Sequence, residues 1–170
     1  MPKAERGVRN GSVYVAGVAA ALAGYFIYQT WFNPSRAVKQ RLGEIAGVLS
    51  VPASEGDVDR TARLSKLRGY LGDGVKVRAG QMEFNARDAI VAALMNVPPE
   101  TSALDVQCVD VQVSVESETS AHTGMMLEVS ARDPRSGDLR SDRYETITDL
   151  EKRAGEWVVV RAEIRVRSPQ

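Results

Sequence analysis

Few side chains of this 170-residue chain have the types and spacing that acid–base chemistry needs. Such chemistry commonly uses a carboxylate with a histidine or a tyrosine, placed where burial shifts the pKa toward a useful value. The only histidine, His122, lies in the polar stretch 118–122, which favours an exposed turn over a catalytic base. Asp110 and Glu116 alternate with valines, so we expect them on a solvated face of a strand. The sequence therefore predicts no catalytic residue.

The sequence also lacks the residue patterns that are typical of metal, nucleotide or nucleic-acid binding. One histidine and one cysteine cannot build a His- or Cys-rich metal site, and no Walker loop or glycine-rich dinucleotide turn is present. We expect neither a metal nor a cofactor. The formal net charge is zero, and acidic and basic residues are interspersed. This charge pattern does not indicate the basic surface that nucleic-acid binding requires. Cys108 stands among apolar strand residues, so we favour a buried thiol over an intermolecular disulfide.

An apolar pocket is the binding site that the residue pattern best allows. Valines 109, 111, 113 and 115 alternate with polar residues, as do Met125, Leu127, Val129 and Ala131. Their shared face could hold an apolar ligand or could form ordinary core, and core is the better supported alternative. The pocket candidates are Tyr70, Cys108, Val111, Val113, Met125, Leu127 and Tyr144. Tyr70 and Tyr144 could bring hydroxyl groups to the pocket mouth or serve as half-buried struts.

The last strand offers candidates for a protein interface. Val158, Val160, Ala162, Ile164 and Val166 are expected on one face by simple alternation. The opposite, outer face would then carry the interface candidates Trp157, Val159 and Arg161. For Trp157, a packing role after the last hairpin is the favoured alternative.

The elements that position these residues fall into two groups along the chain. Three helices are predicted first: one after Pro34 that stops before Pro52, one over 58–71, and one over 86–95. Asp57 and Asn85 are the expected N-caps, and Gly72 is the expected C′ glycine of the second helix. A short strand over 74–78 and a connection over 80–84 separate the second and third helices.

Four long strands follow, because the hydrophobic period changes from about 3.6 to 2 after residue 105. Val106 and Cys108 have the opposite parity to Val109 and Val111, so we expect a one-residue β-bulge near Cys108. Helices gathered before a meander of strands predict an α+β fold, in which an antiparallel sheet wraps around the helices.

Residues 12–32 form an uncharged apolar stretch long enough to cross a bilayer as a helix. Tyrosine, tryptophan and phenylalanine crowd its end, as in the aromatic belts of membrane helices. A signal peptide cleaved at Ala23 is the alternative, but the apolar run continues past that point. Lys3, Arg6 and Arg9 precede the span and three basic residues follow it; the free amino terminus favours an N-terminus inside.

Two local phrases resemble the nuclear transport factor 2-like superfamily, including its SnoaL-like branch. Residues 85–90, Asn-Ala-Arg-Asp-Ala-Ile, are similar to the start of its third helix, although Asn-Ala replaces the usual glycine. Gly155-Glu156-Trp157 resembles the turn that opens its last strand. The resemblance covers residues 35–167 and implies a cone-shaped, strongly curved antiparallel sheet around three helices, with a pocket inside. Some members are isomerases, dehydratases or cyclases, and others bind ligands or proteins.

Together these observations predict a short basic tail (1–11), a transmembrane helix (12–32) and a nuclear transport factor 2-like α+β domain (33–170). The expected protein is a single-pass inner-membrane protein with an extracytoplasmic, periplasmic domain. We expect a binding or assembly module with membrane lipid around residues 12–32 and a homodimer or membrane-complex partner. An apolar small molecule is a further possible ligand. A SnoaL-like enzyme acting on an apolar metabolite is the alternative.

Overall fold

The computed structural model describes residues 18–22, 33–96, 103–133 and 136–166. The chain divides into two compact units, Met1–Pro34 and Ser35–Gln170. In the first unit, residues 18–22 are helical. Most of the predicted membrane helix at 12–32 lies outside the described residues. Among the residues that are described, no helix combines the length and the apolar character needed to cross a membrane.

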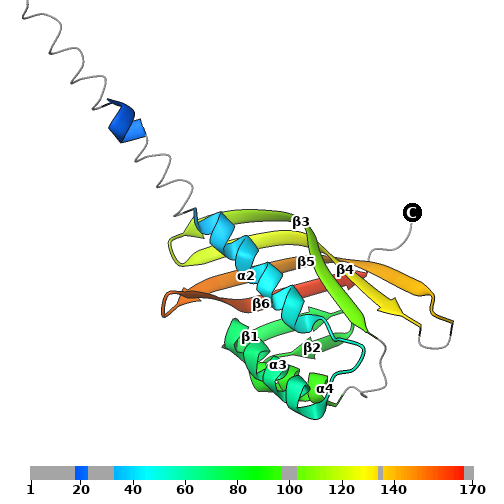
Figure 1. Ribbon diagram of the computed structural model, residues 1–170. Coiled ribbons are helices and arrows are strands. Elements are labelled where there is room, and N and C mark those ends of the chain that lie inside the picture. Colours follow the sequence, from blue (N-terminus) through cyan, green and yellow to red (C-terminus); the bar gives the residue numbers. More distant parts are fainter. Residues whose placement is uncertain (1–17, 23–32, 97–102, 134–135, 167–170) are drawn as a thin grey trace, which may run out of the picture. The chain divides into compact units, whose positions relative to one another are not determined.

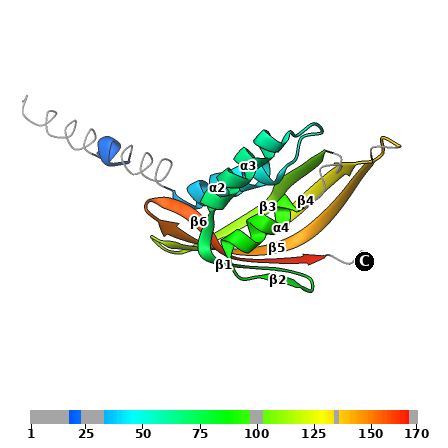
Figure 2. The same cartoon turned by 90° about the horizontal axis from the view of Figure 1, so that it is seen from below.

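The second unit is an α+β domain with three helices and a six-stranded sheet (Figure 1). In chain order the elements are α2 (Pro34–Leu49), α3 (Asp57–Tyr70), β1 (Leu71–Ala79), β2 (Met82–Phe84), α4 (Arg87–Met95), β3 (Leu104–Ser117), β4 (Ser120–Arg132), β5 (Leu139–Arg153) and β6 (Glu156–Val166). The predicted order of helices and long strands is confirmed. The helices gather beside the curved strands β3 to β6 (Figures 1 and 2).

The sheet is mixed, whereas the sequence predicted an antiparallel one. Its strand order is β2-β1-β6-β5-β4-β3, and β1 pairs with β6 in parallel, with Val77 opposite Ala162. Strands β1 and β6 are separated in sequence by α4 and by strands β2 to β5, so no local sequence pattern predicts that they pair. The predicted connection over 80–84 is also wrong, because Met82–Phe84 forms β2 against Val77–Ala79. Three residues are too few to show an alternating pattern.

Three predicted helix boundaries shift by one residue. Gly56 and Ala86 occupy the N-cap positions that were predicted for Asp57 and Asn85. Gly72 follows the C-cap Leu71 and so occupies the predicted C′ position, but it lacks the positive φ of a capping glycine and is a buried residue of β1. A Cβ at position 72 would lie 3.3 Å from Val160 Cγ1, so close strand approach, rather than helix termination, accounts for this glycine.

The predicted bulge in β3 is confirmed, two residues beyond Cys108. Val109 pairs with Met126 and Gln112 pairs with Gly124, so β3 has one extra residue here. Asp110 takes up the irregularity with a φ of 53°. The bulge places Cys108 and Val111 on the same inner face, although two residues lie between them. Val109, predicted to face inward, instead pairs with Met126 on the opposite face.

A second bulge, in β6, was not predicted, and it corrects the assignment of faces there. Leu150 pairs with Val159 and Asp149 pairs with Arg161, which leaves Val160 as the extra residue. Trp157 and Val159 therefore share the inner face with Ala162, and the prediction that they lie on the outer face is wrong. Trp157 is only 4% exposed.

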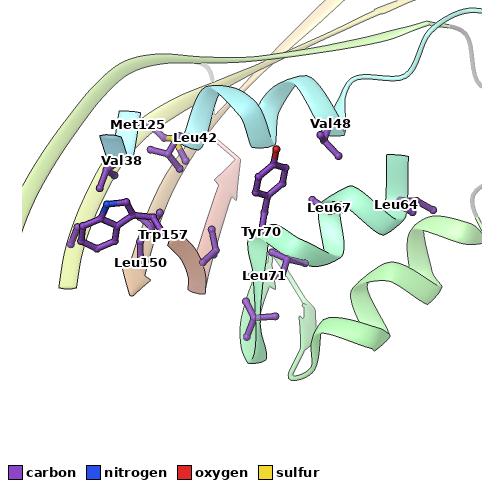
Figure 3. Packing of buried hydrophobic residues seen from close by; sticks show 13 residues of the cluster. Val38, Leu42, Val48, Leu64, Leu67, Tyr70, Leu71, Met125, Leu150 and Trp157 are labelled. Carbon is purple, nitrogen blue, oxygen red and sulfur yellow. The ribbon is translucent and has the colours of Figure 1, made fainter. Parts of the chain in front are cut away.

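The core lies between the helices and the inner face of the sheet (Figure 3). Val38 and Leu42 of α2, Leu67 of α3, and Leu150 and Trp157 of the β5–β6 hairpin are among its buried members. Tyr70, at the end of α3, directs its ring at α2 (Figure 3), and the Arg41 guanidinium lies over that ring at 5.0 Å from its centre. Arg41 also pairs with Glu156, so α2 is tied to the last hairpin.

Candidate apolar ligand site

An apolar cavity of about 220 Å³ lies between the helices and the inner face of the sheet. All three helices and five strands, β1 and β3 to β6, contribute to its wall. The lining residues are Leu42, Ile45, Ala46, Leu49, Leu67, Leu71, Val77, Ile90, Leu94, Cys108, Met125, Leu127, Thr146, Thr148, Val159, Ala162 and Ile164. The wall is therefore almost wholly hydrocarbon.

Helical spacing explains the roof of this cavity. Leu42, Ile45 and Leu49 recur at intervals of three and four along α2, so they share the face that meets the sheet. Ile90 and Leu94 do the same along α4. The small side chain of Ala46 also belongs to this roof, between the larger α2 residues.

The floor comes from strand alternation and from the two bulges. Met125 and Leu127 alternate along β4, and Thr146 and Thr148 alternate along β5. In β6 the extra residue Val160 allows Val159 and Ala162 to face the same cavity. Without that bulge, one of the two would point to the outer face.

Thr146 and Thr148 bring the only hydroxyl groups among the lining residues. Both side chains are 2% exposed, and neither Oγ1 has a hydrogen-bond partner within the described part of the chain. Thr123, on the neighbouring strand, differs, because its hydroxyl donates to the Thr148 carbonyl oxygen at 3.2 Å. The floor thus contains two polar groups whose hydrogen-bonding capacity is not used by the protein.

Cys108 is the one titratable residue in the wall. Its thiol donates to the Leu42 carbonyl oxygen across a distance of 3.7 Å, which links β3 to α2. Burial raises the pKa of the Cys108 thiol, so the neutral form is favoured at physiological pH. The sequence predicted a buried thiol, and in the structure Cys108 is a free cysteine of intermediate exposure.

The wall contains no carboxylate, imidazole or phenol, and no cluster of three or more potential metal ligands occurs in the described ranges. An acid–base reaction inside the cavity would have to use the Cys108 thiol or the two threonine hydroxyls. His122 lies elsewhere, exposed on the outer face, where its Nδ1 is 2.6 Å from Asp149 Oδ1. The arrangement can enclose and orient an apolar molecule, but it offers little proton transfer.

The structure brings three of the seven pocket candidates to the cavity wall: Cys108, Met125 and Leu127. Val111 and Val113 pack against the neighbouring core, outside the wall. Tyr70 is buried under Arg41, and Tyr144 is half-buried opposite the lining residue Leu127. Neither tyrosine is among the lining residues, and a place for their hydroxyl groups at the cavity mouth stays a prediction.

Of the interface candidates, only Arg161 is exposed. Val159 is 5% exposed and lines the cavity, so it belongs to the ligand site rather than to an outer surface. Sequence reasoning missed Thr146 and Thr148, because they lie in a charged stretch that indicated a half-exposed strand. The signal was their spacing: Thr146, Thr148 and Leu150 are every second residue of the strand, so they share the face on which Leu150 is buried.

Comparison with known proteins identifies the fold. No protein-family model matches the chain, and no curated protein matches it in sequence. Among solved structures, a candidate scytalone dehydratase from Novosphingobium aromaticivorans is similar with a TM-score of 0.68 and 16% identity, over 82% of this chain and 88% of that one. A nuclear transport factor 2-like protein with a cystatin-like fold, from the same organism, has a TM-score of 0.68 and 12% identity, over 88% and 92% of the two chains.

The CaMKII hub homology domain of Chlamydomonas reinhardtii is similar as well, with a TM-score of 0.64 and 11% identity, over 79% of this chain and 99% of that one. The domain therefore has a nuclear transport factor 2-like α+β fold with a mixed six-stranded sheet. At these identities the likeness concerns the fold alone.

Proposed function

We propose that this protein is a binding module that takes a small, neutral, apolar molecule into the cavity between its helices and its sheet. The observation that carries the proposal is the cavity of about 220 Å³ with its nearly continuous hydrocarbon wall. A cavity of about 150 Å³ lined by aliphatic side chains can bind benzene. By that scale this cavity suits a molecule of about nine non-hydrogen atoms.

Binding is favoured over catalysis by the chemistry of the wall. A SnoaL-like enzyme acting on an apolar metabolite would need convergent acids or bases near the substrate. The described lining offers a neutral thiol and two hydroxyls instead. The fold supports both functions equally, so the side chains decide the preference.

We further propose that residues 12–32 anchor the domain in a membrane, with the N-terminus inside and the domain on the extracytoplasmic side. The uncharged apolar composition of this stretch supports the anchor, as do the exposed side chains of Val18 and Leu22. Carbonate extraction of cell membranes tests it: the full chain should stay in the pellet. A Leu22→Arg variant should be partly extracted, and release of the unchanged chain would contradict the anchor.

Self-association is a second candidate function, because several structural neighbours are hub or association domains. The outer face of the sheet is the surface available for it, and Arg161 lies exposed there. Analytical ultracentrifugation of the full chain should then detect a dimer that Arg161→Glu weakens. A monomer at all concentrations would exclude this candidate.

Ligand binding can be tested with cumene, which has about the size estimated above. The full chain is labelled with ¹³C at the methionine methyl groups and held in phosphatidylcholine nanodiscs. Cumene should shift the Met125 resonance and leave those of the exposed Met82 and Met95 in place. Comparing variants in the same nanodiscs cancels the partition of cumene into lipid.

Two variants make this test specific. Ala162→Ile adds three carbons to the cavity floor and should abolish the cumene shift, because the added side chain occupies the ligand's space. Ala131→Ile is the matched control: it makes the same change at a half-buried β4 position outside the cavity wall. Equal loss of binding in both variants, or no shift of Met125 in the unchanged protein, would contradict the proposed function.

A further inference from the structure

Thr146 and Thr148 are placed where an apolar side chain would be expected. They lie on the inner face of β5, with Thr146 opposite Met125 and Ile164, and Thr148 opposite Thr123 and Ala162. Valine has nearly the same shape and an equal preference for strands, and it would leave no polar atom in this core. A physical account of these two residues must therefore explain the hydroxyl groups.

The protein itself does not use these hydroxyls within its described part. Neither Oγ1 has a partner, although both are buried, and a buried hydroxyl without a hydrogen bond destabilises the folded state. Thr123 shows that the same face can satisfy a threonine, because its hydroxyl bonds to the Thr148 carbonyl oxygen. Among the residues that line the cavity, the two threonines are thus the ones with a buried polar side-chain atom that has no hydrogen-bond partner.

A threonine can present this capacity to a bound molecule at small conformational cost. Its hydroxyl and methyl groups are attached to the same Cβ, and rotation about χ1 exchanges their positions between staggered rotamers. The two side chains line the cavity, but their Oγ1 atoms are buried and are not exposed to it in the structure. Recognition of an occupant therefore requires a change of the χ1 rotamer that turns a hydroxyl toward the cavity.

The remaining wall limits the charge of the occupant. No charged side chain lines the cavity, and the Cys108 thiol is directed at the Leu42 carbonyl oxygen. A carboxylate or an ammonium group would lose its hydration there without gaining a counter-charge, which is strongly unfavourable. A neutral oxygen, such as that of a ketone, needs only the hydrogen bond that a hydroxyl supplies.

We infer that Thr146 and Thr148 form a polar recognition site within the cavity, which selects neutral apolar molecules carrying a carbonyl or hydroxyl oxygen over pure hydrocarbons and over ions. This inference rests on the proposed function, since it specifies the ligand class of the same cavity. The two threonines are specificity determinants, and no reaction step is assigned to them.

A pair of probes of the same size tests the inference. Acetophenone and cumene have equal numbers of non-hydrogen atoms, and in acetophenone a carbonyl oxygen replaces one methyl group and the methine hydrogen of cumene. Binding of each is followed through the Met125 methyl resonance of the full chain in nanodiscs. In the double variant Thr146→Val/Thr148→Val, acetophenone should bind about tenfold more weakly, whereas cumene should bind equally well or better. Thr123→Val is the control. It should change the affinity for neither acetophenone nor cumene, because the Thr123 hydroxyl is bonded within the sheet.

The outcomes separate the two proposals. If both probes bind and the double variant changes them by the same factor, the threonines do not recognise oxygen and the inference is wrong, while the cavity remains a ligand site. If neither probe shifts Met125 in the unchanged protein, the proposed function fails and the inference fails with it. A benzoate titration is the charge control, and benzoate binding as tight as that of acetophenone would overturn the exclusion of ions.

Discussion

The hydroxyl of Thr123 donates to the carbonyl oxygen of Thr148 at 3.2 Å, whereas the hydroxyl of Thr148 has no partner in the described part of the chain. The two residues are opposite each other on neighbouring strands. The same residue type therefore has two energetic roles on one face of the sheet. One hydroxyl stabilises the pairing of β4 with β5, and the other is left for an occupant of the cavity.

This difference predicts opposite effects of the same substitution on stability. Thr146→Val and Thr148→Val should each raise the free energy of unfolding by about 1 kcal/mol, because each removes an unsatisfied buried hydroxyl. Thr123→Val should lower it by about 1 kcal/mol, because a hydrogen bond is lost. Urea denaturation of the three variants measures these changes. Destabilisation by all three would show that the cavity hydroxyls are bonded in the free protein.

The bulge in β3 predicts a position-specific response to glycine. Asp110 has a φ of 53°, in the left-handed region that glycine adopts without strain. Asp110→Gly should leave stability unchanged or raise it by up to about 1 kcal/mol, whereas Asp110→Val should lower it by about 1–2 kcal/mol. Ser114→Val, at a regular exposed position of the same strand, is the control and should change stability by less than about 0.5 kcal/mol. Equal effects of valine at both positions would contradict the strained backbone at residue 110.

Burial of Cys108 predicts that its thiol is alkylated slowly. Because burial raises its pKa, a smaller fraction is thiolate at pH 8 than for an exposed cysteine, and access is restricted as well. Alkylation by iodoacetamide, followed by mass spectrometry, should be about tenfold slower than for glutathione. The double variant Cys108→Ser/Ser114→Cys moves the thiol to the exposed face of β3 and should react at the rate of glutathione. Equal rates for the two proteins would argue against the buried thiol.

The loop between α2 and α3 predicts a dependence of stability on pH. The Arg63 guanidinium donates to Glu55 Oε2 at 2.9 Å and to the Val48 carbonyl oxygen at 3.0 Å. The hydrogen bond from Arg63 lowers the pKa of the Glu55 carboxyl in the folded state. Its contribution is therefore complete above the unfolded pKa of about 4.3 and is lost as the pH falls through the lower folded value.

Glu55→Gln should accordingly destabilise the protein at pH 7 and have little effect near pH 3. Urea denaturation across this range measures the difference from the unchanged protein. Glu118→Gln, which alters an exposed turn carboxylate, is the control and should produce no such trend. A constant difference at all pH values would show that packing, rather than ionisation, accounts for the effect.

Local patterns predicted most of the fold because they act over a few residues. The apolar spacing of Val38 and Leu42 specifies a helix with one buried face, and the alternation through Val111 and Val113 specifies a strand. The bulge near Cys108 was predictable as well, since a change of parity within one strand is visible in the sequence. The bulge at Val160 was not, because valines occur at 158, 159 and 160 and show no change of parity.

By itself, the sequence determined the order of the three helices and the long strands, the lack of a catalytic motif and the apolar character of residues 12–32. These properties follow from composition and short-range periodicity. Only the tertiary structure decided that β1 runs parallel to β6, that Trp157 and Val159 are buried, and that Thr146 and Thr148 meet α2 and α4 across a cavity. Such relationships join residues far apart in the chain, and their energies depend on which faces meet after the sheet has formed.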